Sequence, residues 1–265
     1  MLYQNLISIS QKKLLNKLAM ALGYYNVTKI SNCMSRIRIE VINPSLLACD
    51  ESFLILNTQG IIREDNFIHL IYGKISSQLA VQLNLLYKAL HDTFTLELIN
   101  LLQGSKNIQK LTHTDKQITI FINDSIEINQ QLLQDLSHTH NIIIQQKNNS
   151  ILLLVDQNLQ EIFTIIQYTL LFWDTIQSLF IINTLKISNI TNITRTNYTL
   201  KIDTTIPIAM HTTIWGHYGL ETSPNSVSEN EIYIHNISNE LFESLLEYYH
   251  FLINGNNFFD KKSLP

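Results

Sequence analysis

Hydrophobic and polar residues alternate strictly through the segment Arg36–Val41. A period of two is typical of a strand with one face buried and the other in solvent. The pattern therefore places Arg36 and Arg38 on the same solvent-facing side, about 7 Å apart along the strand. The opposite, buried side is formed by Ile37, Ile39 and Val41.

The hydrophobic pattern around this strand predicts an α+β unit. Helical and alternating segments follow one another in the order helix, strand, strand, helix, strand, strand, helix. That order, with short connections, favours a small antiparallel sheet with helices packed on one face. The expected elements are Lys12–Leu22, Val27–Ser31, Arg36–Ile42, Ser45–Leu56, Gly60–Arg63, Phe67–Tyr72 and Ser76–Ala89.

The same pattern recurs twice further along the chain, which predicts three tandem modules. Residues 26–30 (NVTKI) are echoed 81 positions later by residues 107–111 (NIQKL), and Ile61-Ile62 then corresponds to Ile142-Ile143. A fainter third copy places Tyr218-Gly219-Leu220 where the first has Gln59-Gly60-Ile61. Asp92 and Asp174 are each expected to cap the helix that opens a copy. The predicted domains are residues 10–91, 92–173 and 174–256, with a tail at 257–265.

The connections between copies are expected to be helical. Between Lys74 and Gln103 there is neither glycine nor proline, so one helix should run into the next with little freedom. The apolar stretch Ile162–Leu185 raises the question of a membrane-spanning helix. Because Asp174 near its middle would cost about 3 kcal/mol in a bilayer, a buried connecting helix is the better interpretation, and no transmembrane segment is expected.

Composition narrows the function classes. Charged residues make up 15% of the chain and the net charge is −4, with no cluster of lysines or arginines, so nucleic-acid binding is not expected. No metal-ligand spacing and no glycine-rich nucleotide loop occur, so no metal or other cofactor is expected. The two cysteines and the lack of a signal peptide favour a reducing, cytoplasmic setting. Cys49 is interpreted as a small buried apolar residue, and a disulfide between Cys33 and Cys49 stays open.

The candidate chemistry lies at Cys33, at a turn just before the strand with the two arginines. Nearby positive charge favours a thiolate, and the guanidinium groups of Arg36 and Arg38 match the oxygens of a phosphoryl group. Backbone N–H groups of the turn at Met34 and Ser35 would add an anion-binding nest. The Ser35 hydroxyl would either bind the phosphoryl oxygens or cap the turn. This pattern predicts a cysteine that accepts a phosphoryl group.

The segment Leu18–Gly73 resembles a known family. It is similar to the B domain (enzyme IIB, glucose and N-acetylglucosamine type) of the bacterial phosphoenolpyruvate-dependent sugar phosphotransferase system. Four residues depart from that family. They are Tyr24, Asn32, Ser35 and His69, where the family commonly has Gly, an acidic or small residue, Thr and Gln. The matching motifs are Ala21-Leu22-Gly23, Asn26-Val27-Thr28, Cys33-Met34-Ser35-Arg36-Ile37-Arg38, Gly60-Ile61-Ile62 and Ile68-His69-Leu70-Ile71-Tyr72-Gly73.

The resemblance implies a phosphoryl carrier with two partners. Cys33 would accept the phosphoryl group from a phosphohistidine of an enzyme IIA, aided by Arg36 and Arg38, and pass it to a sugar bound by a membrane enzyme IIC. The protein would then be cytoplasmic, or attached to the inner face of the membrane through enzyme IIC. His69 is expected to make a partly buried polar contact.

The other two copies lack this chemistry. Thr114 stands in the place of Cys33, Gln117 in that of Arg36 and Thr119 in that of Arg38, and the third copy has Thr194 or Thr196 at the cysteine position. An aliphatic hydroxyl is a weak nucleophile without an activating base, so these copies are interpreted as degenerate. They leave an alternative open, in which the protein is a non-catalytic regulatory or interaction protein that binds phosphotransferase partners.

Overall fold

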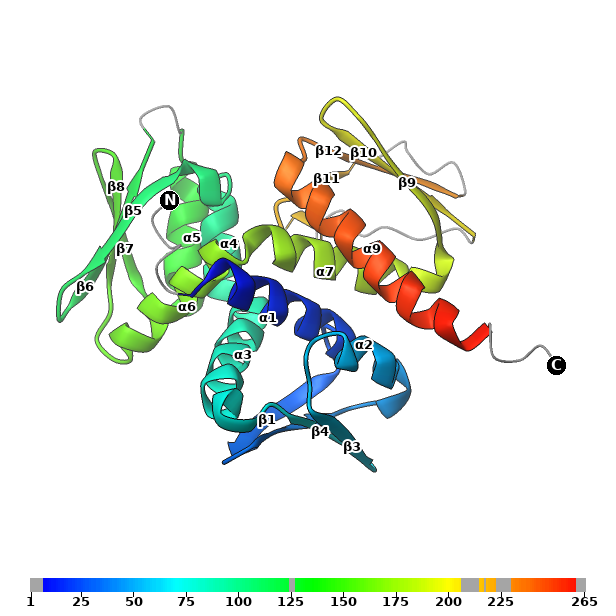
Figure 1. Cartoon of the computed structure of the whole chain (residues 1–265). Helices are drawn as coiled ribbons and strands as arrows, with labels where there is room; N and C mark the ends of the chain where they lie inside the picture. Colours follow the sequence, from blue (N-terminus) through cyan, green and yellow to red (C-terminus); the bar gives the residue numbers. More distant parts are fainter. Residues whose placement is uncertain (1–6, 124–126, 206–214, 217, 223–229, 261–265) are drawn as a thin grey trace.

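The computed structural model describes residues 7–123, 127–205, 215–216, 218–222 and 230–260 of the chain. Within them the protein contains three four-stranded antiparallel sheets, each built from one part of the sequence (Figure 1). The fold is therefore α+β with three sheet-containing modules, as the repeated pattern predicted.

The three sheets share one strand order. The second strand of each copy lies between the first and the fourth, and the third strand forms one edge. The strands of the first sheet are β1 (Val27–Cys33), β2 (Arg36–Val41), β3 (Gly60–Glu64) and β4 (Phe67–Ile71). Those of the second are β5 (Ile108–His113), β6 (Gln117–Ile122), β7 (Ile143–Lys147) and β8 (Ser150–Leu154). Those of the third are β9 (Ile190–Thr196), β10 (Thr199–Thr204), β11 (Glu221–Thr222) and β12 (Glu231–His235).

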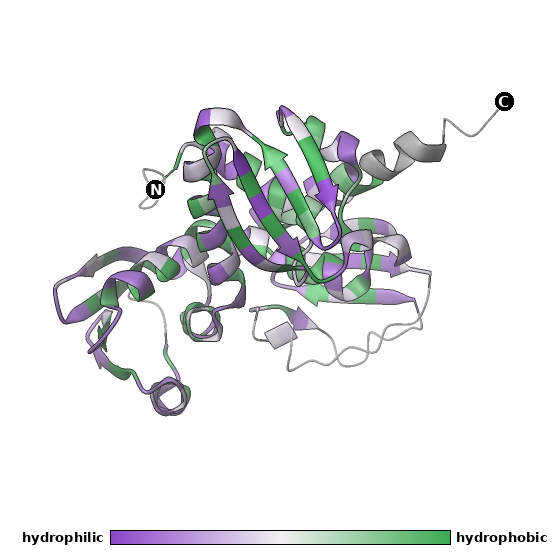
Figure 2. Cartoon of the chain, turned by 90° about the horizontal axis from the view of Figure 1, so that it is seen from below, coloured by the Kyte–Doolittle hydropathy of each residue, from purple (hydrophilic) through white to green (hydrophobic). Residues whose placement is uncertain are grey.

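The helices gather at the centre of the molecule, and the sheets lie around them (Figure 1). Each sheet thus has helices on one face, and along its strands hydrophobic and hydrophilic residues alternate (Figure 2). The α-helices are α1 (Ile9–Leu22), α2 (Asp50–Leu54), α3 (Ser76–His91), α4 (Thr93–Leu101), α5 (Gln130–His140), α6 (Leu159–Leu171), α7 (Trp173–Leu185) and α9 (Asn239–Asp260).

The alternation in β2 separates its two faces as predicted. Ile37 and Ile39 have no exposed surface, and α3 packs against β1 and β2 on that side. Burying such side chains stabilises the fold by about 1.5–3 kcal/mol each. Arg38 is exposed and Arg36 is half-buried on the other face, which leaves both free to serve a site.

One of the two predicted helix caps is confirmed. The Asp92 carboxylate accepts a hydrogen bond of 2.8 Å from the Thr95 backbone N–H at the start of α4. Asp174 is not a cap, because α7 begins one residue earlier, at Trp173. Its carboxylate instead accepts a hydrogen bond of 3.0 Å from the Ser238 hydroxyl, and burial raises its pKa.

The predicted helix Ser45–Leu56 is wrong in extent. A 3-10 turn at Pro44–Leu46 and the five-residue α2 replace it. The Asn43 side chain accepts hydrogen bonds from Ser45, which fixes a tight turn around Pro44 instead of a helical start. Cys49 is the half-buried N-cap residue of α2, and no disulfide joins it to Cys33.

The strand registers correct the alignment of the copies. The offset of 81 residues holds for β2 and β6, where Gln117 takes the place of Arg36. At the third strand the offset is 83 residues, so Ile143 takes the place of Gly60. The predicted match of Ile142-Ile143 to Ile61-Ile62 is therefore wrong. In the third copy, Glu221 holds the position that Gly60 holds in the first sheet, opposite the end of the last strand. The sequence pattern had placed Gly219 there, which is wrong. Between the first two copies, the segment from the second strand to the third differs in length, whereas the hairpins do not. In the third copy, residues 223–230 separate β11 from β12, so its last hairpin is longer.

The modules join at helix breaks. α3 and α4 are separated by Asp92, and α6 and α7 by Phe172, so the predicted helical connectors are present and each is interrupted at one residue. Residues 257–260 of the expected tail belong to α9, and residues 261–265 lie outside the described part of the chain. No single helix of the described residues is long and apolar enough to span a membrane. The pair α6 and α7 passes on length and composition only when taken together, with a bend of 72°.

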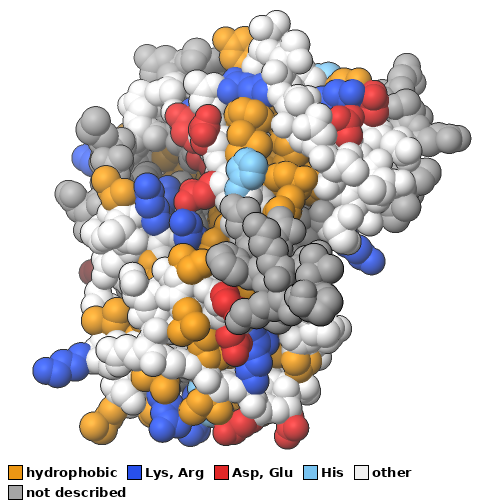
Figure 3. All heavy atoms as spheres, turned by 45° about the vertical axis from the view of Figure 1, so that its right-hand side comes forward, with side chains coloured by type: hydrophobic (Ala, Val, Ile, Leu, Met, Phe, Trp, Pro, Cys, Tyr) orange, Lys and Arg blue, Asp and Glu red, His pale blue; other side chains and the backbone are white. Residues whose placement is uncertain are grey.

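The buried hydrophobic side chains of all three modules form one connected core. Polar contacts also cross between modules: the Tyr24 hydroxyl lies 2.7 Å from the Tyr218 hydroxyl, and Lys88 pairs with Glu161 at 2.6 Å. On the face shown in Figure 3, basic and acidic side chains are interspersed.

Candidate functional site

Cys33 lies at the tip of the hairpin between β1 and β2. It is the last residue of β1 and pairs in register with Arg36, the first residue of β2, so Met34 and Ser35 form a two-residue loop. Cys33 is an exposed free thiol, and 94% of Met34 is accessible to solvent. The predicted position of the cysteine, exposed at a tight turn, is confirmed.

The outer face of the first sheet brings the candidate residues together. Directly opposite residues of antiparallel strands share a face, with Cβ atoms about 4.5–5.5 Å apart. Cys33 is opposite Arg36, and the next pair along β2 on this face, Ser31 and Arg38, lies beside it. On its other side, Arg38 is opposite His69 of β4. Long arginine side chains at these positions can close around a group held on the sulfur.

The surroundings of Cys33 favour its ionised form. The pKa of the thiol is lowered, first by a hydrogen bond from the backbone N–H of Ser35 and further by the N–H of Arg36 and by the charges of Arg38 and Arg36. The backbone contribution exceeds that of the arginines, so the turn itself prepares the sulfur for an anionic state. Backbone N–H groups that point at one site form an anion-binding nest.

Arg36 and Arg38 are available for an external anion. Within the described part of the chain, neither guanidinium forms an ion pair or a side-chain hydrogen bond. The other two arginines are engaged: Arg63 bonds to Asp50 at 2.8 Å and to the Ala48 carbonyl at 2.7 Å, and Arg195 bonds to the Asn197 carbonyl at 2.6 Å. The two cations beside the thiol are thus the arginines without a protein partner among the described residues.

The end of β4 holds the Cys33 turn in place. The Ser35 carbonyl accepts hydrogen bonds from the backbone N–H groups of Tyr72 (3.1 Å) and Gly73 (3.2 Å). Gly73 has φ +61°, a left-handed conformation that disfavours residues with a side chain. The Ser35 hydroxyl makes no hydrogen bond to any described residue, so it does not cap the turn.

The sequence did not predict how deeply the His69 side chain is buried. It belongs to the outer face with Arg38, yet only 6% of its surface is exposed, and its Nδ1 has no hydrogen-bond partner among the described residues. The expected polar contact is therefore missing at that atom. The alternation of Phe67, His69 and Ile71 could have assigned His69 to this face, but its burial depends on side chains of neighbouring strands.

The equivalent positions of the other two sheets hold threonine where the first sheet has Cys33. In the second sheet Thr114 pairs with Gln117 through a backbone hydrogen bond of 2.9 Å. Cys33 lies opposite the first residue of β2, and in the third sheet Thr196 lies opposite the first residue of β10. Thr196, and not Thr194, is therefore at the cysteine position. Lys201 lies where Arg38 lies in the first sheet, but it is paired with Asp203 and Glu231 at 3.1 and 2.7 Å.

The chain was compared with protein-family models and with curated proteins, and neither comparison found a match. The resemblance to an enzyme IIB domain therefore stays a prediction from the motif residues of the first module.

Proposed function

We propose that the first module is a phosphoryl carrier of the sugar phosphotransferase system. The observation that supports this most is the exposed Cys33 thiol, with a lowered pKa, beside two arginines that have no protein partner among the described residues. Phosphoryl transfer depends mainly on positioning and on electrostatic stabilisation of the transferred oxygens, and these residues supply both.

In the proposed step, the Cys33 thiolate attacks the phosphorus of a phosphohistidine on an enzyme IIA. The sulfur–phosphorus bond forms as the nitrogen–phosphorus bond breaks, and the departing imidazole nitrogen takes up a proton. Arg36 and Arg38 bind the phosphoryl oxygens, and the N–H groups of the turn hold the charge near the sulfur. A sugar hydroxyl, bound in a membrane enzyme IIC, then attacks phosphorus: the oxygen–phosphorus bond forms, the sulfur–phosphorus bond breaks to release the thiolate, and the hydroxyl proton passes to solvent. The protein works on the cytoplasmic side of that membrane component.

The test is transfer to Cys33. The full chain is incubated with phosphorylated enzyme IIA of the glucose type, and its peptides are examined by mass spectrometry for phosphate on Cys33. Cys33→Ser should abolish the label, and the control Cys49→Ser should retain it. Arg38→Ala should keep the fold, because its side chain makes no bond to a described residue, and should slow onward transfer to sugar by roughly 10²-fold or more. Normal sugar phosphorylation by Arg38→Ala would remove the role given to this arginine.

The second candidate is a regulatory or interaction protein that binds phosphotransferase partners without carrying phosphate. The observation that favours it is that two of the three modules keep the sheet but have threonine at the cysteine position. Binding of enzyme IIA with no phosphate on Cys33 under the same conditions would support this function and exclude the carrier.

A further inference from the structure

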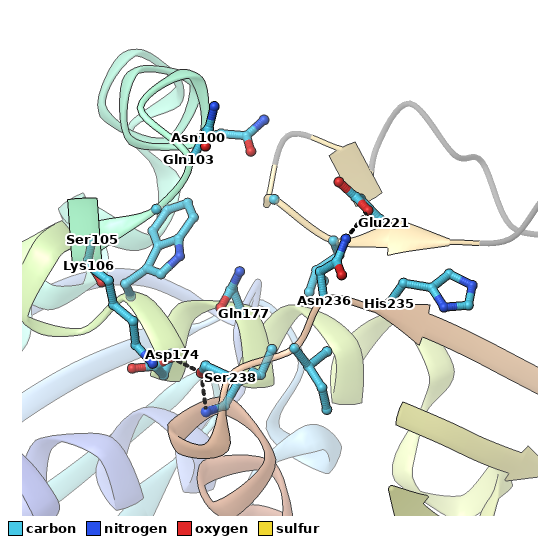
Figure 4. A pocket seen from close by; sticks show the side chains of 16 residues that line it. Asn100, Gln103, Ser105, Lys106, Asp174, Gln177, Glu221, His235, Asn236 and Ser238 are labelled. Carbon is cyan, nitrogen blue, oxygen red and sulfur yellow. Dashed lines mark hydrogen bonds between the residues drawn. The ribbon is translucent and has the colours of Figure 1, made fainter. Parts of the chain in front are cut away.

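A cavity of about 610 Å³ lies between the second and third modules, and none of the residues around Cys33 lines it. Its wall is formed by the end of α4, the turn after it, the first turns of α7, and the segments around β11 and β12 (Figure 4). The volume falls within the range of small-molecule sites, about 300–1,000 Å³. Segments distant in sequence thus enclose a space large enough for a ligand.

The orientation of three amide side chains in the wall is fixed by their own hydrogen bonds. The Asn100 amide donates to the Gly216 carbonyl at 2.6 Å, and the Gln177 amide donates to the Tyr218 carbonyl at 2.8 Å. The Asn236 amide donates to the Glu221 carboxylate at 2.6 Å. One N–H of each amide is engaged in these bonds, so each side chain keeps its second N–H as a donor and its oxygen as an acceptor. Gln177 extends between Asp174 on one side and Asn236 on the other (Figure 4).

The charges around the cavity nearly balance. Lys106 pairs with Glu240 at 2.7 Å, and Asp174 accepts a hydrogen bond from Ser238. The charge of Glu240 and the opposite charges of Lys12 and Lys106 act on Asp174, and Glu221 is a further carboxylate of the lining. Burial raises the pKa of Asp174, which shows that these cations do not fully offset its desolvation. The site therefore offers no strong field for a multiply charged ligand of either sign.

Trp173 supplies an apolar wall. It is buried, and the backbone of Gly219 approaches its ring so closely that a Cβ there would lie 3.5 Å from Cζ2. Gly219 adopts φ +65°, and the same Cβ would lie 3.0 Å from the Asn100 side-chain oxygen. A Cβ at this position would only touch the ring, but it would crowd the Asn100 side chain and would be strained at this φ. Glycine therefore lets the backbone lie against both the ring and the amide.

We propose that this cavity binds a small, uncharged, polyhydroxylated molecule. Hydroxyl groups both donate and accept hydrogen bonds, so they match fixed amide oxygens as well as the carboxylates and Lys106. The ring of Trp173 is suited to a C–H face of the same molecule. This inference is independent of phosphoryl transfer at Cys33.

Isothermal titration calorimetry of the full chain tests the proposal with named probes. Glucose, ribose and myo-inositol are the neutral probes, and spermidine and inorganic phosphate are the charged ones. Saturable binding of at least one neutral probe is expected, with both charged probes binding at least about tenfold more weakly. Binding of the charged probes alone, or of none of the five up to 50 mM, would overturn the proposal.

Tryptophan fluorescence locates the bound probe. The chain has two tryptophans, and Trp215 does not line the cavity, so Trp215→Phe leaves Trp173 as the reporter. Its emission should change with the same Kd as the calorimetric signal. If Trp215→Phe does not fold, competition between the neutral probes in the unaltered chain is measured together with the variants below. Binding without any change at Trp173 would place the site elsewhere and would refute the assignment.

Two variants and a control separate the cavity from the rest of the surface. Ser105→Phe fills the cavity and should weaken binding at least about tenfold, and Glu221→Ala, which removes an acceptor, should weaken it about threefold to tenfold. Thr93→Phe places the same ring on the exposed start of α4, outside the cavity lining, and should bind normally. Equal affinity in all three folded variants would overturn the proposal. Phosphate transfer to Cys33 should be unchanged throughout, so that failure here leaves the carrier function intact.

Discussion

Cys33 and Cys49 differ in what surrounds their sulfur atoms. Cys49 is half-buried, with its sulfur 3.3 Å from the Ser52 hydroxyl. Cys33 is exposed and faces two backbone N–H groups and two guanidinium groups, which lower its pKa. The thiolate is the reactive form of cysteine, so the turn at Cys33 selects one thiol of the two for chemistry at neutral pH.

The first prediction concerns the pH dependence of Cys33 alkylation. The rate of iodoacetamide modification should rise with pH around a midpoint below the usual thiol pKa of about 8.5, because the folded environment favours the charged form. Arg38→Ala should move the midpoint upward but not to the free value, since the N–H groups of Ser35 and Arg36 remain. Peptide mass analysis separates the signals of the two cysteines.

Arg63→Ala serves as the matched control for this titration. Arg63 is on β3, the far edge strand of the same sheet, and pairs with Asp50. Its loss should leave the Cys33 midpoint unchanged. A Cys33 midpoint at or above that of a free thiol would contradict the electrostatic description of the turn.

The second prediction concerns His69. An unpaired buried polar atom costs about 1–3 kcal/mol, so His69→Leu should raise the free energy of unfolding, by about 1 kcal/mol, in urea denaturation at neutral pH. His138→Leu, at an exposed position on α5, should change it by less than about 0.5 kcal/mol. A loss of stability in His69→Leu would show that Nδ1 is satisfied in solution. If His69→Leu is more stable but accepts phosphate on Cys33 more slowly, His69 Nδ1 is retained for function at a cost in stability.

At the scale of elements, the hairpin of β1 and β2 depends on the end of β4. The Ser35 carbonyl is fixed by two N–H groups from Tyr72 and Gly73, although more than 35 residues separate them in sequence. The rigidity of the turn is therefore a property of the sheet and not of the hairpin alone. Positioning of this kind is what phosphoryl transfer requires.

The third prediction is that Gly73→Ala disturbs both the fold and the turn. Alanine at φ +61° costs about 1–2 kcal/mol, so the free energy of unfolding should fall by about that amount, and labelling of Cys33 should slow. Gly73→Asn should restore part of both, because asparagine tolerates the left-handed region. Gly216→Ala is the control, since its φ is not left-handed and a Cβ would meet nothing within 4 Å. Equal stability of the two alanine variants would show that the Gly73 conformation is not strained.

Most of the fold follows from the sequence because strands and repeats are local patterns. Period-two alternation located β2 and β12, and the turn before Arg36 followed from where the alternation begins. The helix predicted at Ser45–Leu56 failed because Asn43 and Pro44 form a competing turn through hydrogen bonds that periodicity does not detect.

The site was less predictable where it depends on contacts between strands. The thiol and both arginines lie in one short motif, so sequence reasoning found them. The burial of His69 and the bonds of Tyr72 and Gly73 to Ser35 depend on how β4 lies against β2. The change of offset between copies occurs in connecting segments, where added residues cost little free energy. This change of offset is found only by comparing the strand registers of the sheets.

At the scale of the whole molecule, the central helices serve more than one sheet. α3 packs on the first sheet and also against α6 of the second module, and α9 of the third module packs against α1 and α2 of the first. The ion pairs between modules are exposed, and such pairs contribute about 0–1 kcal/mol each. The shared hydrophobic core, which all three modules enter, therefore provides most of the coupling. The two modules without the thiol thus stabilise the one that has it.

The fourth prediction tests this coupling at Tyr24 and Tyr218. The fully buried Tyr24 hydroxyl donates to the Leu90 carbonyl at 2.7 Å and lies 2.7 Å from the Tyr218 hydroxyl. Tyr24→Phe leaves both groups short of a partner and should lower the free energy of unfolding by about 1–3 kcal/mol. Tyr218→Phe should cost less, because Tyr24 keeps its bond to Leu90, and the exposed Tyr198→Phe should have no effect.

The double variant distinguishes a coupled molecule from three independent modules. Because the two hydroxyls share one interaction, the losses in Tyr24→Phe and Tyr218→Phe should sum to more than the loss in the double variant. Calorimetry of the unaltered chain should show a single transition whose calorimetric and van't Hoff enthalpies agree, since the modules share one core. Additive losses together with two or three separate transitions would mean that the first module folds alone, and that the other two act on Cys33 only through the partners they bind.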